Sequence, residues 1–211
     1  MTETSYRIRA FDHQDLDSLY EICLKTAAAG EDGSELYRNS PRSVGDLYAA
    51  PYAAFAPGLV HILEDDAGAC GYVLGVTDTA AFEDWLEDHW FPLMRERYPW
   101  PTGDPAAFTA AERLISRFHQ PVVRESGLIV REYPAHLHID ILPRGQGRGN
   151  GRSLMTSFLN DLRSRGIAGV HLGLGLRNHR ALRFYSKLGF TELEKRGDPP
   201  NSMLMGLRLA D

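Results

Sequence analysis

The sequence is poor in three features that mark special classes of protein. It has only two cysteines, Cys23 and Cys70, in 211 residues, which is too few for a disulfide-stabilised scaffold. It has no run of about 18 apolar residues, as a membrane-spanning helix needs, and its first residues lack the pattern of a signal peptide. Its 43% hydrophobic and 24% charged residues are typical of a globular chain. We therefore expect a cytoplasmic protein without contact to a membrane.

Positive charge is outnumbered overall but concentrated in one stretch. The formal net charge is −5, yet residues 144–187 contain eight Arg and one Lys against a single acid, Asp161. This stretch carries a formal charge of +8, which leaves −13 for the rest of the chain. A local positive charge of this size indicates an anionic partner, and nucleic acid and a phosphate-bearing cofactor are the two candidates.

Hydrophobic periodicity predicts a mixed α/β order of elements. Strands are predicted near residues 5–11, 59–64, 70–76, 136–142, 170–176, 190–194 and 203–209. Helices are predicted after Asp12 or Asp15, after a glycine-rich loop and after Asn178. Residues 30–51 are interpreted as a connector or as the lining of a cleft, and residues 78–134 as a helical insertion. This order favours a mixed sheet with helices on both faces, in one domain over residues 1–211.

A glycine-rich segment joins one predicted strand to the next helix. Its candidate binding residues are Arg144, Gln146, Gly147, Arg148, Gly149, Asn150, Gly151 and Arg152. Glycines let backbone N–H groups converge, and the helix N-terminus adds a positive dipole, so this turn fits a pyrophosphate. It matches neither the nucleotide loop GxxxxGK[ST] nor the dinucleotide fingerprint GxGxxG. Taken alone, such a Gly/Arg run is also typical of flexible RNA-binding segments.

Together with a second motif, this loop resembles the GNAT superfamily of acetyl-coenzyme A-dependent N-acetyltransferases. The loop of that family reads Arg/Gln-x-x-Gly-x-Gly/Ala, met here by Gln146, Gly149 and Gly151 after a strand that ends in Ile141-Leu142-Pro143. The second element, Asn-x-x-Ala-x-x-Phe-Tyr-x-x-x-Gly-Phe, is present as Asn178, Ala181, Phe184, Tyr185, Gly189 and Phe190. Residues 62–65, 70–75 and 184–189, with the Trp-rich insertion between them, also resemble the acetyltransferase-like C-terminal domain of O-GlcNAcase. This resemblance implies a free-standing homologue of that domain.

The resemblance implies a GNAT fold and a set of acetyl-CoA contacts. The central sheet is expected to splay after the strand at residues 136–142, with the insertion at 78–134 before the fourth core strand. Residues 143–190 are expected to form the acetyl-CoA-binding core. The glycine loop would hold the pyrophosphate, Asn178 the pantetheine arm, and backbone amides near Ile141 and Leu142 the acetyl carbonyl. Tyr185 matches the family tyrosine that protonates the departing thiolate.

The strand at residues 136–142 carries an unusual row of polar side chains. Its period of two places His136, His138 and Asp140 on one face. We predict that Asp140, which is nearest to the acetyl site, is the general base or orients a base water, provided that burial or a neighbouring His raises its pKa. The His-x-His-x-Asp spacing also fits a metal site, so a metal-dependent hydrolase is an alternative. The prediction we adopt has no metal.

The predicted reaction is transfer of an acetyl group from acetyl-CoA to a primary amine by direct attack. The acceptor is expected to be a small molecule or a peptide, and no motif in the sequence identifies it. The +8 stretch coincides with the predicted phosphate site, which favours coenzyme A over nucleic acid. A module that binds acetyl-CoA without transfer is the second alternative. The resemblance also allows a homodimer, since many relatives dimerise.

Overall fold

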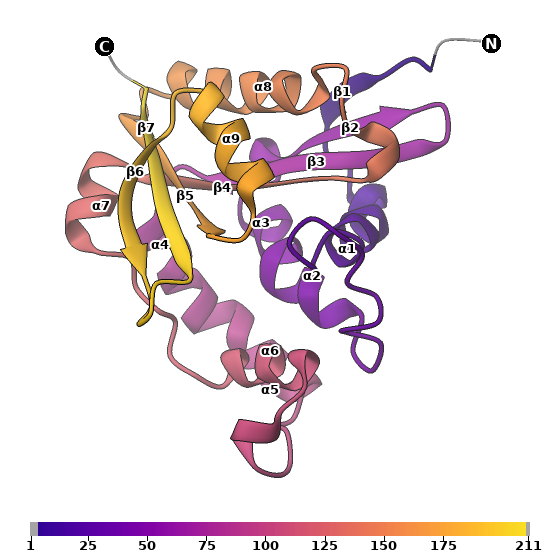
Figure 1. Cartoon of the computed structure of the whole chain (residues 1–211), viewed down its shortest axis with the longest axis vertical. Helices are drawn as coiled ribbons and strands as arrows, with labels where there is room; N and C mark the ends of the chain where they lie inside the picture. The colour runs from indigo at the N-terminus through magenta and orange to yellow at the C-terminus, as the bar shows by residue number, and fades with distance from the viewer. Residues whose placement is uncertain (1–3, 210–211) are drawn as a thin grey trace.

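The chain folds around one seven-stranded mixed sheet, seen in a computed structural model that describes residues 4–209 (Figure 1). The strand order is β1-β2-β3-β4-β5-β7-β6, and all neighbours are antiparallel except β4 and β5. The strands are β1 (Arg7–Ala10), β2 (His61–Asp65), β3 (Gly68–Val76), β4 (Ala135–Ile141), β5 (Gly169–Gly175), β6 (Thr191–Arg196) and β7 (Ser202–Arg208). The predicted mixed α/β sheet is confirmed.

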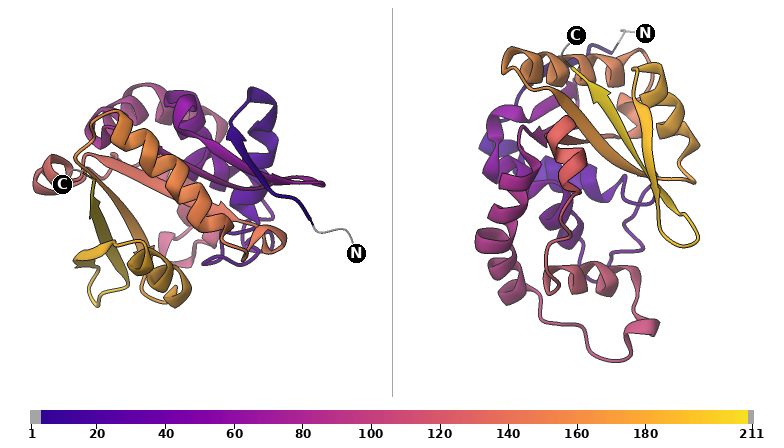
Figure 2. Two further views of the ribbon diagram at one scale, coloured as in Figure 1. Left: turned by 90° about the horizontal axis from the view of Figure 1, so that it is seen from above. Right: turned by 90° about the vertical axis from the view of Figure 1, so that its left-hand side faces the viewer.

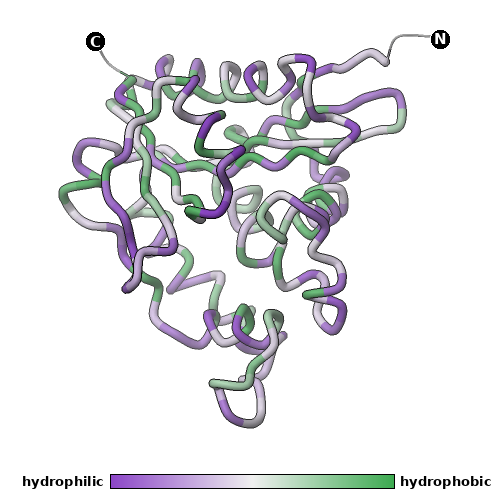
Figure 3. Tube along the Cα trace, viewed as in Figure 1, coloured by the Kyte–Doolittle hydropathy of each residue, from purple (hydrophilic) through white to green (hydrophobic). Residues whose placement is uncertain are grey.

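Helices cover both faces of this sheet. The α-helices are α1 (Leu16–Leu24), α2 (Arg42–Tyr48), α3 (Ala50–Phe55), α4 (Thr79–Trp85), α5 (Phe91–Arg97), α6 (Ala110–Phe118), α7 (Gly127–Glu132), α8 (Asn150–Ser164) and α9 (His179–Lys187). The long helix α8 lies across one face of the sheet (Figure 2). It packs Leu154, Met155 and Phe158 against that face. The first helices and the helices of residues 78–134 pack against the other face, where Tyr72 and Leu74 of β3 point. Apolar stretches accordingly follow the central strands in Figure 3.

The sheet splays open between β4 and β5. These parallel strands pair only at Ala135 with Val170 and at His136 with His171, whereas β3 and β4 pair over six residues. Beyond His136 the edge of β4 that faces β5 is therefore open, because no neighbouring strand follows it. This opening lies where the sequence predicts the splay.

The segment 78–134 is helical and extends the layer opposite α8. It contains α4, a π-helical turn (Leu86–Trp90), α5, α6 and α7. Phe82, Phe91 and Phe118 are each at most 5% exposed and belong to the core on that face. A fully buried carboxylate, Asp46 of α2, accepts hydrogen bonds from the hydroxyls of Tyr20 and Tyr98, and these bonds tie residues 78–134 to the first helices.

Residues 30–51 are more regular than the sequence predicts. The expected connector contains α2 and the start of α3, with Val44 and Leu47 buried in the core. Pro41 and Pro51 suggest interruptions, but proline fits the first turn of a helix, and these two occupy the N-cap of α2 and the first turn of α3. Within residues 4–209 there is no helix with the length and apolarity needed to cross a membrane.

Candidate active site

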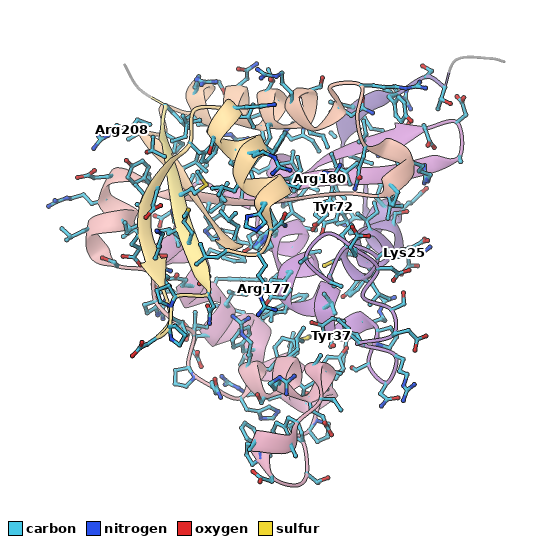
Figure 4. The ribbon with its side chains drawn as sticks, in the orientation of Figure 1. Lys25, Tyr37, Tyr72, Arg177, Arg180 and Arg208 are labelled. Atoms are coloured by element: carbon cyan, nitrogen blue, oxygen red, sulfur yellow. The ribbon has the colours of Figure 1, made fainter. Side chains whose placement is uncertain are left out.

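A cavity of about 970 Å³ occupies the opening between β4 and β5. One side, here called the basic wall, consists of residues from the glycine loop and from residues 177–187, among them Arg148, Arg152, Arg177, Arg180 and Lys187. The opposite side, here called the aromatic wall, comes from α1, α2 and the segment between them and includes Cys23, Thr26, Tyr37 and Tyr48. Figure 4 shows Arg177 and Arg180 on one side of the opening and Tyr37 on the other. Residues 137–141 of β4 lie between the two walls.

The glycine loop has the backbone shape of an anion cradle. Gly147, Arg148 and Gly149 have φ angles of +81°, +50° and +83°, so three successive residues adopt the left-handed region. Helix α8 starts directly afterwards, at Asn150, and its first amides are directed towards the loop. A left-handed turn at the N-terminus of a 15-residue helix is a favourable place for a pyrophosphate. A Cβ at Gly151 would lie 3.2 Å from Phe184, so this turn also packs tightly on α9.

Two of the predicted loop residues, Arg144 and Asn150, do not line the cavity, in contrast to the sequence prediction. Arg144 forms an ion pair with Asp65 at 2.5 Å and donates to the carbonyl oxygen of Ala69, and it does not line the cavity. Asn150 is buried and donates to the carbonyl oxygen of Gly145. Both side chains shape the loop because they tie it to the β2–β3 hairpin and to itself.

The amide of Leu142 is likewise not available for the acetyl carbonyl. Its N–H donates to the carbonyl oxygen of Cys70 at 2.8 Å, so Leu142 continues the pairing of β4 with β3. Antiparallel pairing alternates, so the N–H groups of Ile139 and Ile141 point away from β3, towards the open edge. Both residues line the cavity. The prediction of Ile141 is therefore compatible with the structure, whereas the second amide on the open edge belongs to Ile139 and not to Leu142.

The structure brings the remaining predicted contacts to the cavity. Gln146 lines it and donates from Nε2 to the carbonyl oxygen of Ile141 at 2.8 Å, which fixes the loop on β4. Asn178 lines it and caps α9, because its Oδ1 accepts from the amide of Ala181 at 2.9 Å. Tyr185 lies on the inner face of α9 and lines the cavity with 8% of its surface exposed.

Burial controls protonation at two groups that border the cavity. Burial raises the pKa of Tyr185, and the charge of Asp140 adds to this effect, so the phenol keeps its proton. Burial also raises the pKa of Asp140, while a hydrogen bond from the hydroxyl of Tyr72, at 2.6 Å, opposes that rise. Within residues 4–209 only burial and the charge of Asp140 act on the pKa of Tyr185, and no hydrogen bond to its hydroxyl contributes. The hydroxyl is therefore a proton donor without a competing partner in the protein.

The polar row on β4 does not form a metal site. His136 and His138 both direct Nε2 to the hydroxyl of Tyr52, at 2.9 and 3.0 Å, while Asp140 is held by Tyr72. The three side chains therefore do not converge, and no group of three or more His, Cys, Asp or Glu suited to a metal occurs in the part of the chain that the structure describes. The donor set thus gives the metal-dependent hydrolase no support.

Sequence reasoning missed most of the aromatic wall and part of the basic wall. Tyr37 and Tyr48 fall in the stretch interpreted as a connector or as the lining of a cleft, and both line the cavity, but no local pattern singles out these two residues. Arg177 and Arg180 lie within the +8 stretch and could have been singled out because they flank Asn178. Their charge adds to that of Arg152 on the same wall.

Comparison with known proteins now decides the family. The family described as "Acetyltransferase (GNAT) domain" matches residues 111–192. The crystal structure of SsHAT is 39% identical in sequence, covers 98% of this chain and 100% of its own, and superposes with a TM-score of 0.86. The chain belongs to the GNAT acetyltransferase family. The predictions of a GNAT fold and of an acetyltransferase are therefore confirmed.

This GNAT acetyltransferase is also similar to a longer protein and to a more distant structure of the same fold. Protein O-GlcNAcase of Rattus norvegicus is 31% identical over 215 residues, which cover 99% of this chain. This chain spans only 23% of that protein, so the likeness concerns one part of it. The structure of yncA, a putative acetyltransferase from Salmonella typhimurium with its cofactor acetyl-CoA, shares the fold, with 16% identity, a TM-score of 0.56 and coverage of 98% and 95% of the two chains.

Proposed function

We propose that this protein transfers the acetyl group of acetyl-CoA to a primary amine by direct attack. One observation carries the proposal: a single cavity joins the left-handed glycine turn, the open edge of β4 and the hydroxyl of Tyr185. A phosphate site, amide donors for a carbonyl and a proton donor are the three parts that thioester aminolysis needs. The fold shared with yncA, which holds acetyl-CoA, supports the choice of cosubstrate.

The basic wall is proposed to bind the coenzyme. The amides of Gly147, Gly149 and Gly151 would face the pyrophosphate, and Arg148 and Arg152 would add charge from the same loop. The pantetheine arm would then follow the open edge of β4, with Asn178 as a further donor. This arrangement brings the thioester to the point where β4 and β5 separate.

The amides of the open edge are proposed to stabilise the reaction intermediate. The amine nitrogen attacks the thioester carbonyl carbon, and the N–H groups of Ile139 and Ile141 would donate to the oxyanion that forms. The carbon–sulfur bond then breaks, and Tyr185 would give its proton to the departing thiolate. The high pKa of Tyr185 keeps that proton in place until the thiolate develops.

Asp140 is proposed to hold the incoming amine. The sequence predicts it as the general base or as a group that orients a base water, and we propose an orienting role towards the amine instead because its carboxylate already accepts from Tyr72. A buried carboxylate next to the thioester attracts a cationic or hydrogen-bonding amine. The acceptor, a small molecule or a peptide, would enter along the aromatic wall.

We further propose that residues 1–211 form one acetyltransferase domain, with 78–134 as its insertion and 143–190 as its acetyl-CoA-binding core. The insertion carries part of the core that supports the first helices, as the burial of Phe82, Phe91 and Phe118 indicates. A homodimer and a cytoplasmic location stay predictions from the sequence.

Calorimetry and a coupled assay test the proposed reaction. Acetyl-CoA is titrated into the protein, and release of the coenzyme A thiol is then followed with a panel of a polyamine, an amino sugar, a lysine peptide and a peptide with a free N-terminus. We expect binding of one acetyl-CoA per chain and thiol release that depends on at least one amine, with the acetylated product identified by mass spectrometry. Binding without amine-dependent release would instead support the binding module.

A further inference from the structure

A chain of hydrogen bonds runs beside the cavity through side chains that the proposed reaction does not use. Tyr52 of α3 is 5% exposed, and its hydroxyl lies 2.9 Å from Nε2 of His136 and 3.0 Å from Nε2 of His138. The other ring nitrogen of His136, Nδ1, lies 2.9 Å from Oγ1 of Thr79. The chain therefore links α3, β4 and α4, and it ends at His138, which lines the cavity.

One contact at the far end fixes the direction of every bond in this chain. Oγ1 of Thr79 lies 2.7 Å from the carbonyl oxygen of Pro134, which has no hydrogen, so Thr79 is the donor there. Its oxygen must then accept, so Nδ1 of His136 carries a hydrogen. Burial lowers the pKa of His136 well below its ordinary value, so the ring is neutral and its Nε2 accepts from Tyr52. Tyr52 has only one hydrogen and therefore accepts from Nε2–H of His138.

These directions leave Nδ1 of His138 unprotonated, with a lone pair that can accept a proton. Burial and the charge of Arg117 lower the pKa of His138 to about 4, so the ring is neutral at pH 7. Across residues 4–209 no hydrogen-bond partner of Nδ1 is present. An imidazole that donates from Nε2 accepts a proton more readily at Nδ1, because the chain behind it shares the positive charge.

The groups around His138 suit a site that takes up a proton briefly. The ring of Tyr48 on α2 lies edge-on at 5.8 Å, Tyr52 packs at 5.2 Å, and the ring of His136 lies at 6.5 Å. Burial and the charge of Arg117 on α6 disfavour a lasting imidazolium, and Asp140 lies two residues along the same face of β4. His138 and Asp140 both line the cavity.

We infer that His138 is the general base of the transfer and that Tyr52, His136 and Thr79 are positioning residues that fix its tautomer. This inference rests on the proposed function. As the nitrogen–carbon bond forms, one proton passes from the amine nitrogen to Nδ1 of His138. As the carbon–sulfur bond breaks, Tyr185 gives one proton to sulfur. After the products leave, His138 returns its proton to water and Tyr185 regains one.

The decisive variant is His138→Gln, which keeps a side-chain N–H near the position of Nε2 but has no basic nitrogen. We expect kcat to fall by about 10²- to 10⁴-fold, the range for loss of a general base, with the Kd for acetyl-CoA unchanged. His13→Gln is the matched control, since His13 is exposed and does not line the cavity. The amine in these assays is the one in the panel that gives the fastest thiol release.

Long-range ¹H–¹⁵N NMR of the histidine side chains tests the hydrogen-bond directions without any transfer. At pH 7 we expect the Nε2–H tautomer at His138 and the Nδ1–H tautomer at His136. Tyr52→Phe removes the acceptor of the Nε2–H bond, so we expect mixed tautomers at His138 and a loss of about tenfold in kcat. Thermal unfolding of each variant verifies that it is folded.

The outcomes separate the inference from the function on which it rests. A Nδ1–H tautomer at His138 in the wild-type protein would overturn the inference, as would a His138→Gln variant that transfers acetyl at the wild-type rate. An unchanged tautomer in Tyr52→Phe would remove the positioning role of Tyr52. A wild-type protein that binds acetyl-CoA but acetylates no amine in the panel would overturn the proposed function, and the catalytic role of His138 with it.

Discussion

The two walls of the cavity are built from different chemistry. The basic wall has exposed arginines, such as Arg152 and Arg180, and a turn whose shape comes from left-handed backbone. The aromatic wall has half-buried or buried groups, and burial raises the pKa of Tyr37 and of the Cys23 thiol. The basic wall therefore offers charge and backbone amides. The aromatic wall offers buried side chains, such as Tyr37 and Cys23, that keep their protons. We infer that the first wall holds a constant coenzyme and that the second selects the acceptor.

The largest effect is expected at Tyr185, which lies on the basic wall. Tyr185→Phe removes the proposed proton donor but keeps the ring, so kcat should fall by about 10²- to 10⁴-fold while acetyl-CoA still binds. Tyr133→Phe is the control, because Tyr133 is equally buried, at 8% exposure, and does not line the cavity. Steady-state rates and calorimetry measure the two properties. If kcat of Tyr185→Phe equalled that of the wild type, Tyr185 would be a packing residue and not the proton donor.

The next largest effect is expected at the glycine turn of the basic wall. Gly149 has a φ of +83°, so Gly149→Val places a β-branched residue in left-handed backbone and a side chain at the proposed phosphate site. We expect the affinity for acetyl-CoA to fall by about a hundredfold, equivalent to roughly 2.7 kcal/mol. Calorimetry measures this change.

The control for backbone strain is Gly103→Val, because Gly103 has a φ of +102° and does not line the cavity. It should lose stability but no affinity for acetyl-CoA. Equal losses of affinity in the two variants would mean that the turn acts through folding and not through contact with the coenzyme.

The difference between the walls also explains what the sequence could predict. Gln146, Gly149 and Gly151 lie within one turn, and Asn178 and Tyr185 lie on one helix, so local spacing is enough to identify them. Tyr37 and Tyr48 reach the cavity only because α1, α2 and the insertion pack together around Asp46. Such a placement depends on contacts between distant segments, which no local pattern encodes.

The predicted contacts that do not line the cavity have a related explanation. The sequence shows that Arg144 and Asn150 belong to the loop but not in which direction their side chains point. Asp65, at the end of a distant strand, draws Arg144 away from the cavity. Alternate amides of β4 face β3, so either Leu142 or Ile139 has its N–H on the open edge. Only the pairing with β3 shows that it is Ile139.

A smaller effect, confined to the acceptor, is expected at Asp140. Asp140→Asn removes the charge that attracts the amine, so the KM for the amine should rise by about tenfold while the Kd for acetyl-CoA stays the same. Burial raises the pKa of Asp140, so its carboxylate is lost at a higher pH than usual as the pH falls. The wild-type KM should therefore rise as the pH falls through that pKa, and the variant should lack this dependence. A change in the Kd for acetyl-CoA instead would contradict the inference that separate parts of the cavity bind the coenzyme and the acceptor.

The smallest effects separate two arginines of the same charge. Arg180 is exposed and lines the cavity, so Arg180→Ala should weaken acetyl-CoA binding about threefold at low salt and less at high salt, where exposed charges are screened. Arg144→Ala should leave the Kd unchanged, because its partner is Asp65, but lower the free energy of unfolding by about 1 kcal/mol or less. Titrations at two salt concentrations and thermal unfolding distinguish these effects. Equal weakening by both variants would mean that net charge, and not the position of a side chain on the basic wall, attracts the coenzyme.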